Sequence, residues 1–397
     1  RRSVDTLQKT GYYDTVELAI DDGRHPGEKD LVYKVEEGQT GSIRFAAGIT
    51  SNAGVLGEVT LEKNNFDIAD LPRSWDDLTS GGAFTGGGQR LVLQAQPGTE
   101  ILRFAAKFEE PYLFGYPYGL GLNFQHLTRE RESYDERRLG GEATLSHRWD
   151  FDRDLTTSLG YRNEIVELED VDDDAPSLVR LAEGTTNITS MTLGWNYDRR
   201  DDVGLPTKGY RLNQTSEVAS ENLGGEENFY KIDLRAEWHT TIYRTERGQP
   251  HVFSLYGHGG YGDTYGETAE IPIFERYFAG GRESIRGFKF RGVGPHENGD
   301  PIGGEVLATA SAEYTFPVPI PKFEEILRGV VFVDAGTVAG DLDDPEFDRW
   351  RVAAGFGVRV TIPFLGPRPF AVDFGFPLRS EEDDDEEIVS FSLGKSF

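Results

Sequence analysis

The sequence predicts an all-β transmembrane barrel. Apolar and polar residues alternate with period two in one segment after another, as in strands with one apolar and one wet face. The chain has 48 glycines and one methionine, and aromatic residues make up 12% of it, a composition typical of glycine-rich β proteins. No segment approaches the roughly 18 to 20 consecutive apolar residues of a spanning helix. Any membrane crossing is therefore expected through strands.

Charge and cysteine content exclude several classes of function. The formal net charge of -28 argues against nucleic acid as a partner, because phosphate neutralisation needs a basic face. With no cysteine, the chain can form neither disulfides nor thiolate metal sites, which fits an oxidising compartment. It opens at Arg1 without an initiator methionine or a signal peptide, so we expect an internal fragment or a mature product.

Residues 1–38 are predicted to form a small α+β remnant of a larger module. The stretch SVDTLQKTG has helical spacing and closes at Gly11. The stretches YDTVELAI and KDLVYKVEEG have strand composition, with turn signals between them. Residues 39–397 are expected to form the barrel.

Regular alternation begins at Gly41 and continues to the end of the chain. It runs through Ile43 and Phe45 near the start and Val389–Phe397 at the end, and 13 residues alternate without a break over Trp350–Ile362. A soluble strand usually has about five or six residues. One such segment alone would fit a soluble sandwich, but charged residues repeatedly face long apolar stripes. This favours a barrel with lipid outside and an aqueous lumen inside.

The spacing of the segments agrees with a membrane barrel. About 357 residues shared among 16 strands would give each strand and its connection about 22 residues, enough for a spanning strand of about 9 to 11. The acidic runs ELEDVDDDAP and RSEEDDDEEI are expected to be solvated loop tips, because neither has the spaced ligands and central glycine of a calcium loop. The segment NNFDIADLPRSWDDLTSGGAFTGGGQ is expected to be a structured turn with a short helix. No metal site and no cofactor are predicted.

One glycine-rich loop, FAGGRESIRGFKFRGVGP, carries an unusual density of arginines and aromatics. In GEVLATASAEYTFP and RGVVFVDAGTV, the apolar rows face outward, so Glu313 and Asp334 face the lumen on consecutive strands. If the loop folds inward, the guanidinium of Arg286 can lie between these two carboxylates and form charge-assisted hydrogen bonds. The alternative is that Arg286 decorates an exposed loop.

The string IPIFERYFAGGRESIRGF is similar to a region of the BamA family of outer-membrane assembly factors. In that family the sixth outer loop carries an Arg-Gly-Phe motif that reaches into the barrel, and Arg286, Gly287 and Phe288 match it. The strings GLPTKGYRL, VFVDAGTV and FGFPL resemble other parts of the family's barrel, and LQKTGYYDTVEL with DLVYKVEEG resembles the last part of a POTRA domain. The resemblance covers essentially the whole chain.

The resemblance implies a 16-stranded barrel in the bacterial outer membrane, a periplasmic segment over residues 1–38, and an inward-folded sixth outer loop over about 262–303. The first and last strands of such a barrel meet at an imperfect seam, where a client strand can add to the free edge. The implied partners are unfolded outer-membrane proteins, outer-membrane lipids and possible accessory lipoproteins. The predicted lock is Arg286, Gly287, Phe288, Glu313 and Asp334, and the predicted lateral seam is Ile43, Phe45, Phe391, Leu393, Gly394 and Phe397.

Three other functions remain open at this point. A two-partner secretion transporter of the same superfamily would pass an exoprotein through its lumen, and a diffusion porin would hold its lumen open. An outer-membrane enzyme has little support. The seven histidines are scattered, and none falls in a Ser-His-Asp or His-Glu-x-x-His arrangement. No catalytic residues are therefore predicted.

Overall fold

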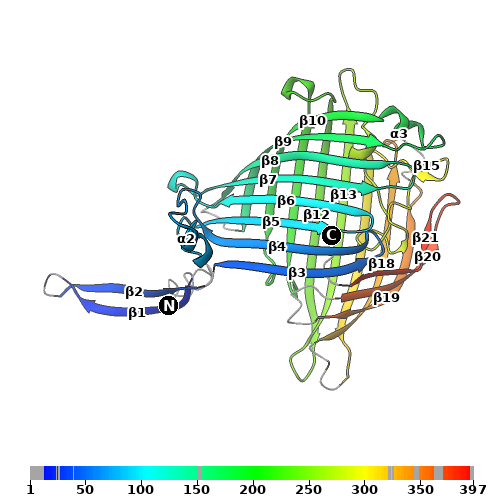
Figure 1. Ribbon diagram of the computed structural model, residues 1–397. Helices are drawn as coiled ribbons and strands as arrows, with labels where there is room; N and C mark the ends of the chain where they lie inside the picture. Colours follow the sequence, from blue (N-terminus) through cyan, green and yellow to red (C-terminus); the bar gives the residue numbers. More distant parts are fainter. Residues whose placement is uncertain are drawn as a thin grey trace.

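In the computed structural model the chain forms a two-stranded hairpin followed by a closed barrel (Figure 1). The structure describes residues 13–23, 25, 27–38, 40–149, 154–320, 323, 326–343, 348–361 and 370–393. The hairpin consists of β1 (Tyr13–Asp22) and β2 (Lys29–Glu37). It lies beside one end of the barrel, here called the hairpin end, and the opposite end is called the loop end. The helix expected over SVDTLQKTG lies outside the described residues, and the assignment of residues 1–38 to a POTRA domain stays a prediction.

The barrel is closed by antiparallel pairing of strands that follow one another along the chain, with β22 returning to β3. The predicted barrel of 16 strands is confirmed. Its strands are β3 (Gly41–Thr50), β4 (Gly54–Phe66), β5 (Gln89–Pro97), β6 (Ile101–Glu110), β7 (Tyr118–Glu130), β8 (Asp135–Arg148), β9 (Leu155–Glu169), β10 (Gly184–Asp198), β11 (Gly209–Ala219), β12 (Phe229–Arg244), β13 (Pro250–Thr264), β17 (Val306–Pro317), β18 (Leu327–Ala339), β19 (Arg351–Val360), β20 (Phe370–Arg379) and β22 (Val389–Leu393).

One strand of the structure is shorter than the alternating segment that predicted it. The pattern over Trp350–Ile362 runs for 13 residues, whereas β19 has 10. Trp350 precedes the strand, and Ile362 lies outside the described residues. At the start of the strand the buried Arg351 pairs with Asp384 of a neighbouring loop, at 2.9 Å. Arg351 is also the residue at which the pairing of β19 with β18 ends, opposite Gly336.

The two faces of the barrel wall differ in polarity in the sense that the sequence predicts. Large apolar side chains on the outer face are exposed, including Phe104, Leu193 and Phe356. The inner face buries charged side chains, among them Glu164 and Asp334, which are 3% and 0% exposed. This reverses the arrangement of a soluble protein and matches a barrel with a hydrocarbon-facing exterior and a polar lumen.

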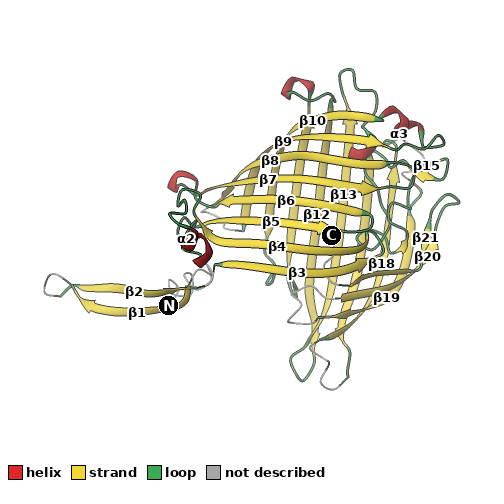
Figure 2. Cartoon of the chain, in the orientation of Figure 1, coloured by secondary structure: helices red, strands yellow, loops and turns green. Residues whose placement is uncertain are grey.

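Short elements lie between the barrel strands at its two ends (Figure 2). The predicted turn helix is α2 (Trp75–Ser80), which begins where the Ser74 side chain accepts a hydrogen bond from the Asp77 amide and ends at Gly81 with φ of 82°. The other short elements are η1 (Leu113–Gly115), α3 (Ser177–Leu181), η2 (Glu221–Leu223), η3 (Ile273–Glu275), β14 (Gly287–Phe288), β15 (His296–Glu297), β16 (Asp300–Pro301) and β21 (Glu386–Glu387). Across the described ranges, no helix is long and apolar enough to cross a membrane.

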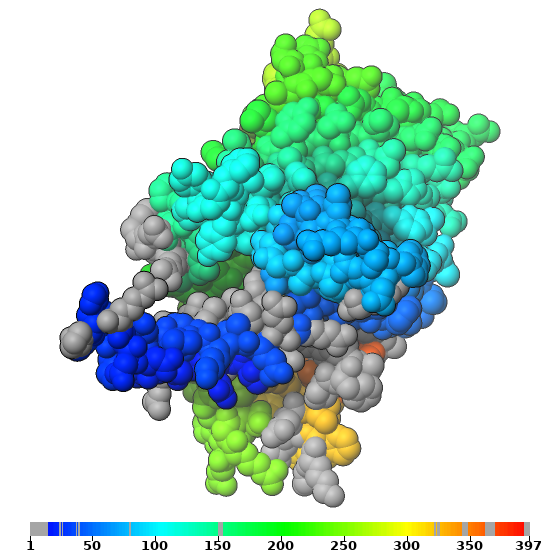
Figure 3. All heavy atoms as spheres, turned by 60° about the vertical axis from the view of Figure 1, so that its left-hand side comes forward, coloured from blue at the N-terminus to red at the C-terminus, as the bar shows by residue number. Residues whose placement is uncertain are grey.

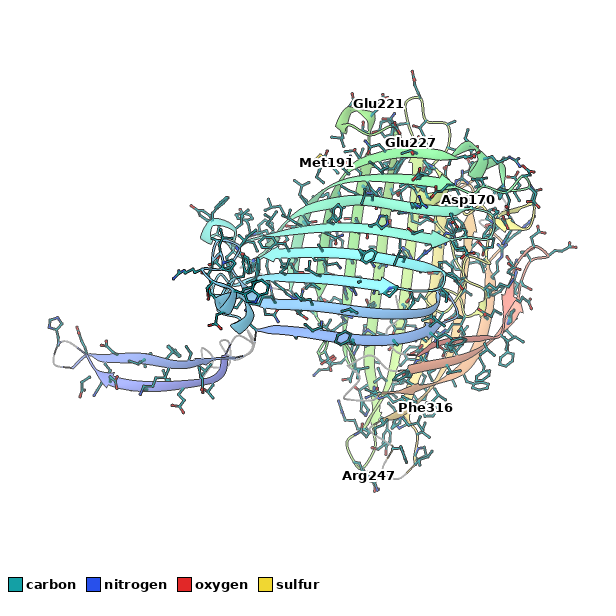
Figure 4. All side chains as sticks on the ribbon, viewed as in Figure 1. Asp170, Met191, Glu221, Glu227, Arg247 and Phe316 are labelled. Carbon is teal, nitrogen blue, oxygen red and sulfur yellow. The ribbon has the colours of Figure 1, made fainter. Side chains whose placement is uncertain are left out.

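The two ends of the barrel carry different connections. Figure 3 brings the hairpin end forward and shows the turns over residues 67–88 and 111–117 side by side above the hairpin. Figure 4 labels side chains at both ends: Asp170, Glu221 and Glu227 lie on one side of the view, and Arg247 and Phe316 lie on the opposite side. The longest connection, residues 265–305 between β13 and β17, starts at the loop end.

In the described part of the chain, the junction between the first and last barrel strands has fewer residue pairs than the other junctions. Among the described residues, β22 pairs with β3 only through Ser392 with Thr50 and Leu393 with Ile49. By contrast, β3 pairs with β4 along its whole length, from Gly41 to Thr50. The backbone edge of β3 that faces β22 is therefore mostly without a strand partner in the described part of the chain.

Candidate functional site: an inward loop held by buried ion pairs

Residues 265–305, here called loop 6, fold back into the barrel instead of extending into solvent. The prediction placed this loop at about 262–303. Its buried residues include apolar side chains, which pack in two clusters with residues of the wall, one glutamate and two arginines. They are Ile271, Ile273, Phe274, Glu275, Tyr277, Ala279, Ile285, Arg286, Phe288, Arg291 and Val293.

Arg286 makes the densest set of polar contacts in the loop. Its Nε and Nη2 donate to the two carboxylate oxygens of Asp334 at 2.7 and 2.8 Å, and its Nη1 donates to Glu313 at 2.8 Å. Ser311 accepts a further bond at 3.1 Å, and the guanidinium carbon lies 3.4 Å from the centre of the Phe332 ring. Burial opposes the charge of Arg286, but the carboxylates outweigh burial and raise its pKa.

The two residues after Arg286 fit the site for different reasons. Gly287 has φ of 98°, and an added Cβ would lie 3.2 Å from Ala353 and from the backbone of Gly375. A side chain at this position would therefore separate the loop from β20. Phe288 is fully buried and packs in an apolar cluster with Ile285 and other residues of the loop and wall. The structure thus brings Arg286, Gly287, Phe288, Glu313 and Asp334 together; their role as a lock stays a prediction.

A third carboxylate, which sequence reasoning did not identify, lies beside this site. Asp373 on β20 is 0% exposed and accepts a hydrogen bond from Arg359 at 2.7 Å. Arg282 of loop 6 lies 3.5 Å from it, and Arg286 lies 4.0 Å from it. The carboxylates of β17, β18 and β20 therefore face arginines of the loop across the lumen, next to a cavity of about 920 Å³.

A second buried ion-pair cluster, also missed from the sequence, has the opposite polarity. Here loop 6 supplies a carboxylate, Glu275, and the wall supplies three cations. Arg162 of β9 donates to Glu275 at 3.0 Å, and Arg138 of β8 and Lys231 of β12 each lie 3.5 Å from it. Lys231 also donates to the Glu275 carbonyl at 2.7 Å, and Arg138 donates to the Phe274 carbonyl at 2.5 Å. Burial alone would raise the pKa of Glu275, but the three cations lower it below its ordinary value.

One acidic run behaves differently from its prediction. The run RSEEDDDEEI was expected to be a solvated loop tip, but the side chain of Asp384 is 0% exposed and pairs with Arg351. The backbone of β21, within the same run, pairs with β14 of loop 6. The backbone of this run therefore holds loop 6, and the side chain of Asp384 ties the run to β19. The prediction failed because composition does not show whether an acid has a buried partner.

The predicted seam residues are only partly described. Ile43 and Phe45 on β3 are 62% and 77% exposed, as expected for side chains that face lipid. Phe391 lies on β22, and Leu393 pairs with Ile49 across the seam. Gly394 and Phe397 lie outside the described residues. Whether these residues form a lateral gate stays a prediction.

The described residues offer no metal centre. No group of three or more histidine or carboxylate side chains among them is arranged to hold a metal ion. His258 instead hydrogen-bonds Asp233 at 2.9 Å, and the Tyr277 hydroxyl of loop 6 donates to the same carboxylate at 2.9 Å. These contacts tie the loop to β12 and β13.

Comparisons with known proteins give a consistent result. The family model described as the Omp85 superfamily domain matches residues 84–397. Outer membrane protein assembly factor BamA of Nitratidesulfovibrio vulgaris is 28% identical over 408 residues, covering 100% of this chain and 47% of that protein. BamA of Neisseria meningitidis serogroup B is 25% identical, covering 100% and 52%. The chain thus spans about half the length of these relatives, and the resemblance to the BamA family is confirmed.

Solved structures show the same fold. The crystal structure of BamA from Haemophilus ducreyi lacking POTRA domains 1–3 has a TM-score of 0.80 at 22% identity, covering 100% of this chain and 78% of that one. CdiB from Acinetobacter baumannii has a TM-score of 0.59 at 17% identity, covering 98% and 66%. At these identities the likeness concerns the fold.

We predict that Arg286→Ala destabilises the barrel by about 3–5 kcal/mol, because the change leaves the buried carboxylate of Asp334 without its cation. The measurement is the temperature at which the refolded barrel loses its compact migration on a gel run in detergent. Asp383→Ser, which removes an exposed acid, is the control and should melt like the unchanged protein. Equal melting of Arg286→Ala and the control would contradict the prediction.

A second prediction concerns the pH dependence of stability. The pKa of Glu275 is lowered in the folded state, so its contribution is present above the unfolded value of about 4.5 and is lost as the pH falls below that value. Thermal unfolding from pH 7 to pH 3 should therefore show a smaller acid loss in Glu275→Gln than in the unchanged protein. Glu283→Gln, an exposed acid of the same loop, should keep the full acid loss. Identical pH profiles for all three proteins would remove Glu275 from the explanation.

Proposed function

Because the chain belongs to the Omp85 superfamily, we propose that it is the barrel portion of a factor that folds and inserts other proteins in the bacterial outer membrane. The observation that carries the proposal is the seam, where the described parts of β22 and β3 share two residue pairs while β3 pairs with β4 along its whole length. A barrel used only as a wall or a channel has no need of an unpaired edge, and exposed edges recruit other strands. The names of the two BamA relatives support the same function.

The chemistry at the seam is backbone hydrogen bonding. Over Gly41–Gly48, β3 pairs with β4 on one side and has no described partner in β22 on the other. A client strand that adds to this edge exchanges its bonds with water for bonds with β3. It thereby enters the membrane without unsatisfied N–H and C=O groups, each of which would cost several kcal/mol in hydrocarbon. The exposed side chains of Ile43 and Phe45 support a position of this edge at the lipid-facing surface.

Loop 6 would keep the barrel in shape while the seam opens. Arg286 holds one part of the loop to β17 and β18, and Glu275 holds another part to β8, β9 and β12. The loop therefore connects walls on both sides of the lumen. In this proposal Arg286, Gly287, Phe288, Glu313 and Asp334 are the lock, and no residue has a catalytic role.

The remaining parts of the proposal follow from the resemblance to the BamA family. Residues 1–38 would be the end of a periplasmic POTRA domain, and residues 39–397 would be the barrel. Unfolded outer-membrane proteins are the proposed clients, outer-membrane lipids are the surroundings, and accessory lipoproteins are further partners. Ile43, Phe45, Phe391, Leu393, Gly394 and Phe397 would border the lateral gate.

The alternatives raised by the sequence differ in what passes through the lumen. A secretion barrel must clear its lumen for an exoprotein, and a porin keeps its lumen open. Buried side chains and ion pairs of loop 6 occupy the lumen here, which favours an assembly factor. Conductance across a planar bilayer separates these functions, because a porin gives a large and steady current.

We predict that a disulfide across the seam stops client insertion. Thr50 and Ser392 are paired residues of β3 and β22, and the chain has no cysteine of its own, so the double variant Thr50→Cys with Ser392→Cys has one cysteine pair. When oxidised, it should insert a client barrel into vesicles at least tenfold more slowly, on the order of a 1.4 kcal/mol higher barrier. Reduction should restore the rate.

The control places the cysteine pair between two strands far from the seam. Met191 and Val218 are paired residues of β10 and β11, so Met191→Cys with Val218→Cys should insert clients at the ordinary rate whether oxidised or reduced. Full insertion activity of the oxidised seam variant would exclude opening at β3 and β22 from the mechanism.

A further inference from the structure

Arg291 of loop 6 is a buried cation without a carboxylate partner among the described residues. It is 6% exposed, and its guanidinium carbon lies 3.2 Å from the centre of the Phe278 ring. Its backbone has φ of 67°, in a turn where the Gly292 amide donates to the Lys289 carbonyl at 3.0 Å. A long side chain adopts this left-handed conformation at a cost that glycine avoids and asparagine largely avoids. Neither local geometry nor ion pairing therefore accounts for an arginine at this position.

A second arginine near Arg291 has an unsatisfied donor. Arg129 stands next to the last residue of β7, at the loop end, and its Nε is buried and has no hydrogen-bond partner in the part of the chain that the structure describes. Arg131 and Arg291 repel its charge, and Glu136 attracts it. A buried N–H group of a cation without an acceptor is costly, and such a group indicates a missing partner.

The carboxylate of Glu136 does not supply that partner, because it is held by other arginines. Its Oε2 accepts two bonds from Arg131, at 3.1 and 2.9 Å, and its Oε1 accepts a bond from Arg138 at 2.6 Å. Both oxygens are thus engaged by arginines other than Arg129 and Arg291. The guanidinium groups of Arg129 and Arg291 therefore lie in surroundings with an excess of positive charge.

A third donor lies in the same place. The hydroxyl of Tyr134, in the connection between β7 and β8, is buried, and its O–H donates to no acceptor among the described residues. Tyr134 belongs to the apolar cluster against which Phe278 packs, and Arg291 lies over the ring of Phe278. Burial and the charge of Arg131 lower the pKa of Arg291 to about 10, and interaction with Tyr134 acts in the opposite direction.

We propose that Arg129, Arg291 and Tyr134 bind an oxyanion of the phosphate class at the loop end of the barrel. Two guanidinium groups can each present paired N–H donors to a tetrahedral oxyanion, and the hydroxyl supplies one more donor. A bound oxyanion would satisfy the orphaned donors of Arg129 and Tyr134 and neutralise the excess charge. It would also join loop 6 to β7, on a side of the lumen that the Arg286 contacts do not reach. The inference stands apart from the proposed assembly function.

Inorganic phosphate and a phosphate monoester of a lipid headgroup share this chemistry, and the experiment separates them. The full chain, refolded in detergent, is titrated calorimetrically with inorganic phosphate and, separately, with phosphatidic acid in mixed micelles, against chloride at equal ionic strength. Saturable binding of inorganic phosphate identifies the free ion as sufficient. Saturable binding of phosphatidic acid alone identifies a lipid source. Binding of neither probe overturns the proposal.

Two variants test the named residues, and a third is the matched control. Arg291→Asn suits the left-handed backbone, and Arg129→Gln removes the other charge; each should weaken binding about tenfold or more, the effect expected for losing a charged hydrogen bond. Arg137→Gln also removes an arginine, but Arg137 is half exposed and pairs with Glu169, so this variant should bind like the unchanged protein. Gel migration before heating confirms that each variant is folded. Equal weakening in all three variants, or in none, would overturn the assignment.

Discussion

A guanidinium group buried inside a barrel is stable only where anionic groups compensate its charge, and for Arg286 the carboxylates of the wall do so. Arg286 can lie deep in the interior because Asp334 and Glu313 face inward from neighbouring strands. Those acids are tolerated because the same loop covers them, so neither side of the contact is favourable without the other. The alternation of the strands provides the acids, and the glycine after Arg286 lets the loop backbone approach the wall.

The second cluster of ion pairs reverses the charges. Glu275 enters a group of cations on β8, β9 and β12, while Arg286 enters a group of acids on β17 and β18. A loop with one charge at both contacts could shift from one wall to the other. A loop with opposite charges at its two contacts has a single favourable placement, because each contact in the wrong wall would bring like charges together. Charge order along loop 6 therefore specifies its register inside the barrel.

The alternation of inward and outward side chains along each strand predicted the barrel wall well. It predicted the contacts between loop 6 and the wall less well. Strand alternation was enough to place Glu313 and Asp334 inward. The same alternation puts Asp373 inward, because it lies between the apolar Val372 and Phe374. Asp373 could therefore have been identified from the sequence. Glu275 had no comparable signal. It lies in an irregular loop, and its partner Arg162 is 113 residues away in the sequence. The acidic run around Asp384 was misread for the same reason, since a buried partner in a distant segment leaves no local pattern.

In the described part of the chain the seam joins the two ends of the barrel sequence through two pairs, whereas β3 with β4 and β12 with β13 pair along most of their length. Closure is therefore a property of the whole ring: the summed twist and tilt of the wall bring the terminal strands near each other. A substitution that flattens the wall on the far side could widen the junction without touching either terminal strand. The stiffness of the entire circumference thus sets how closely the two terminal strands approach each other.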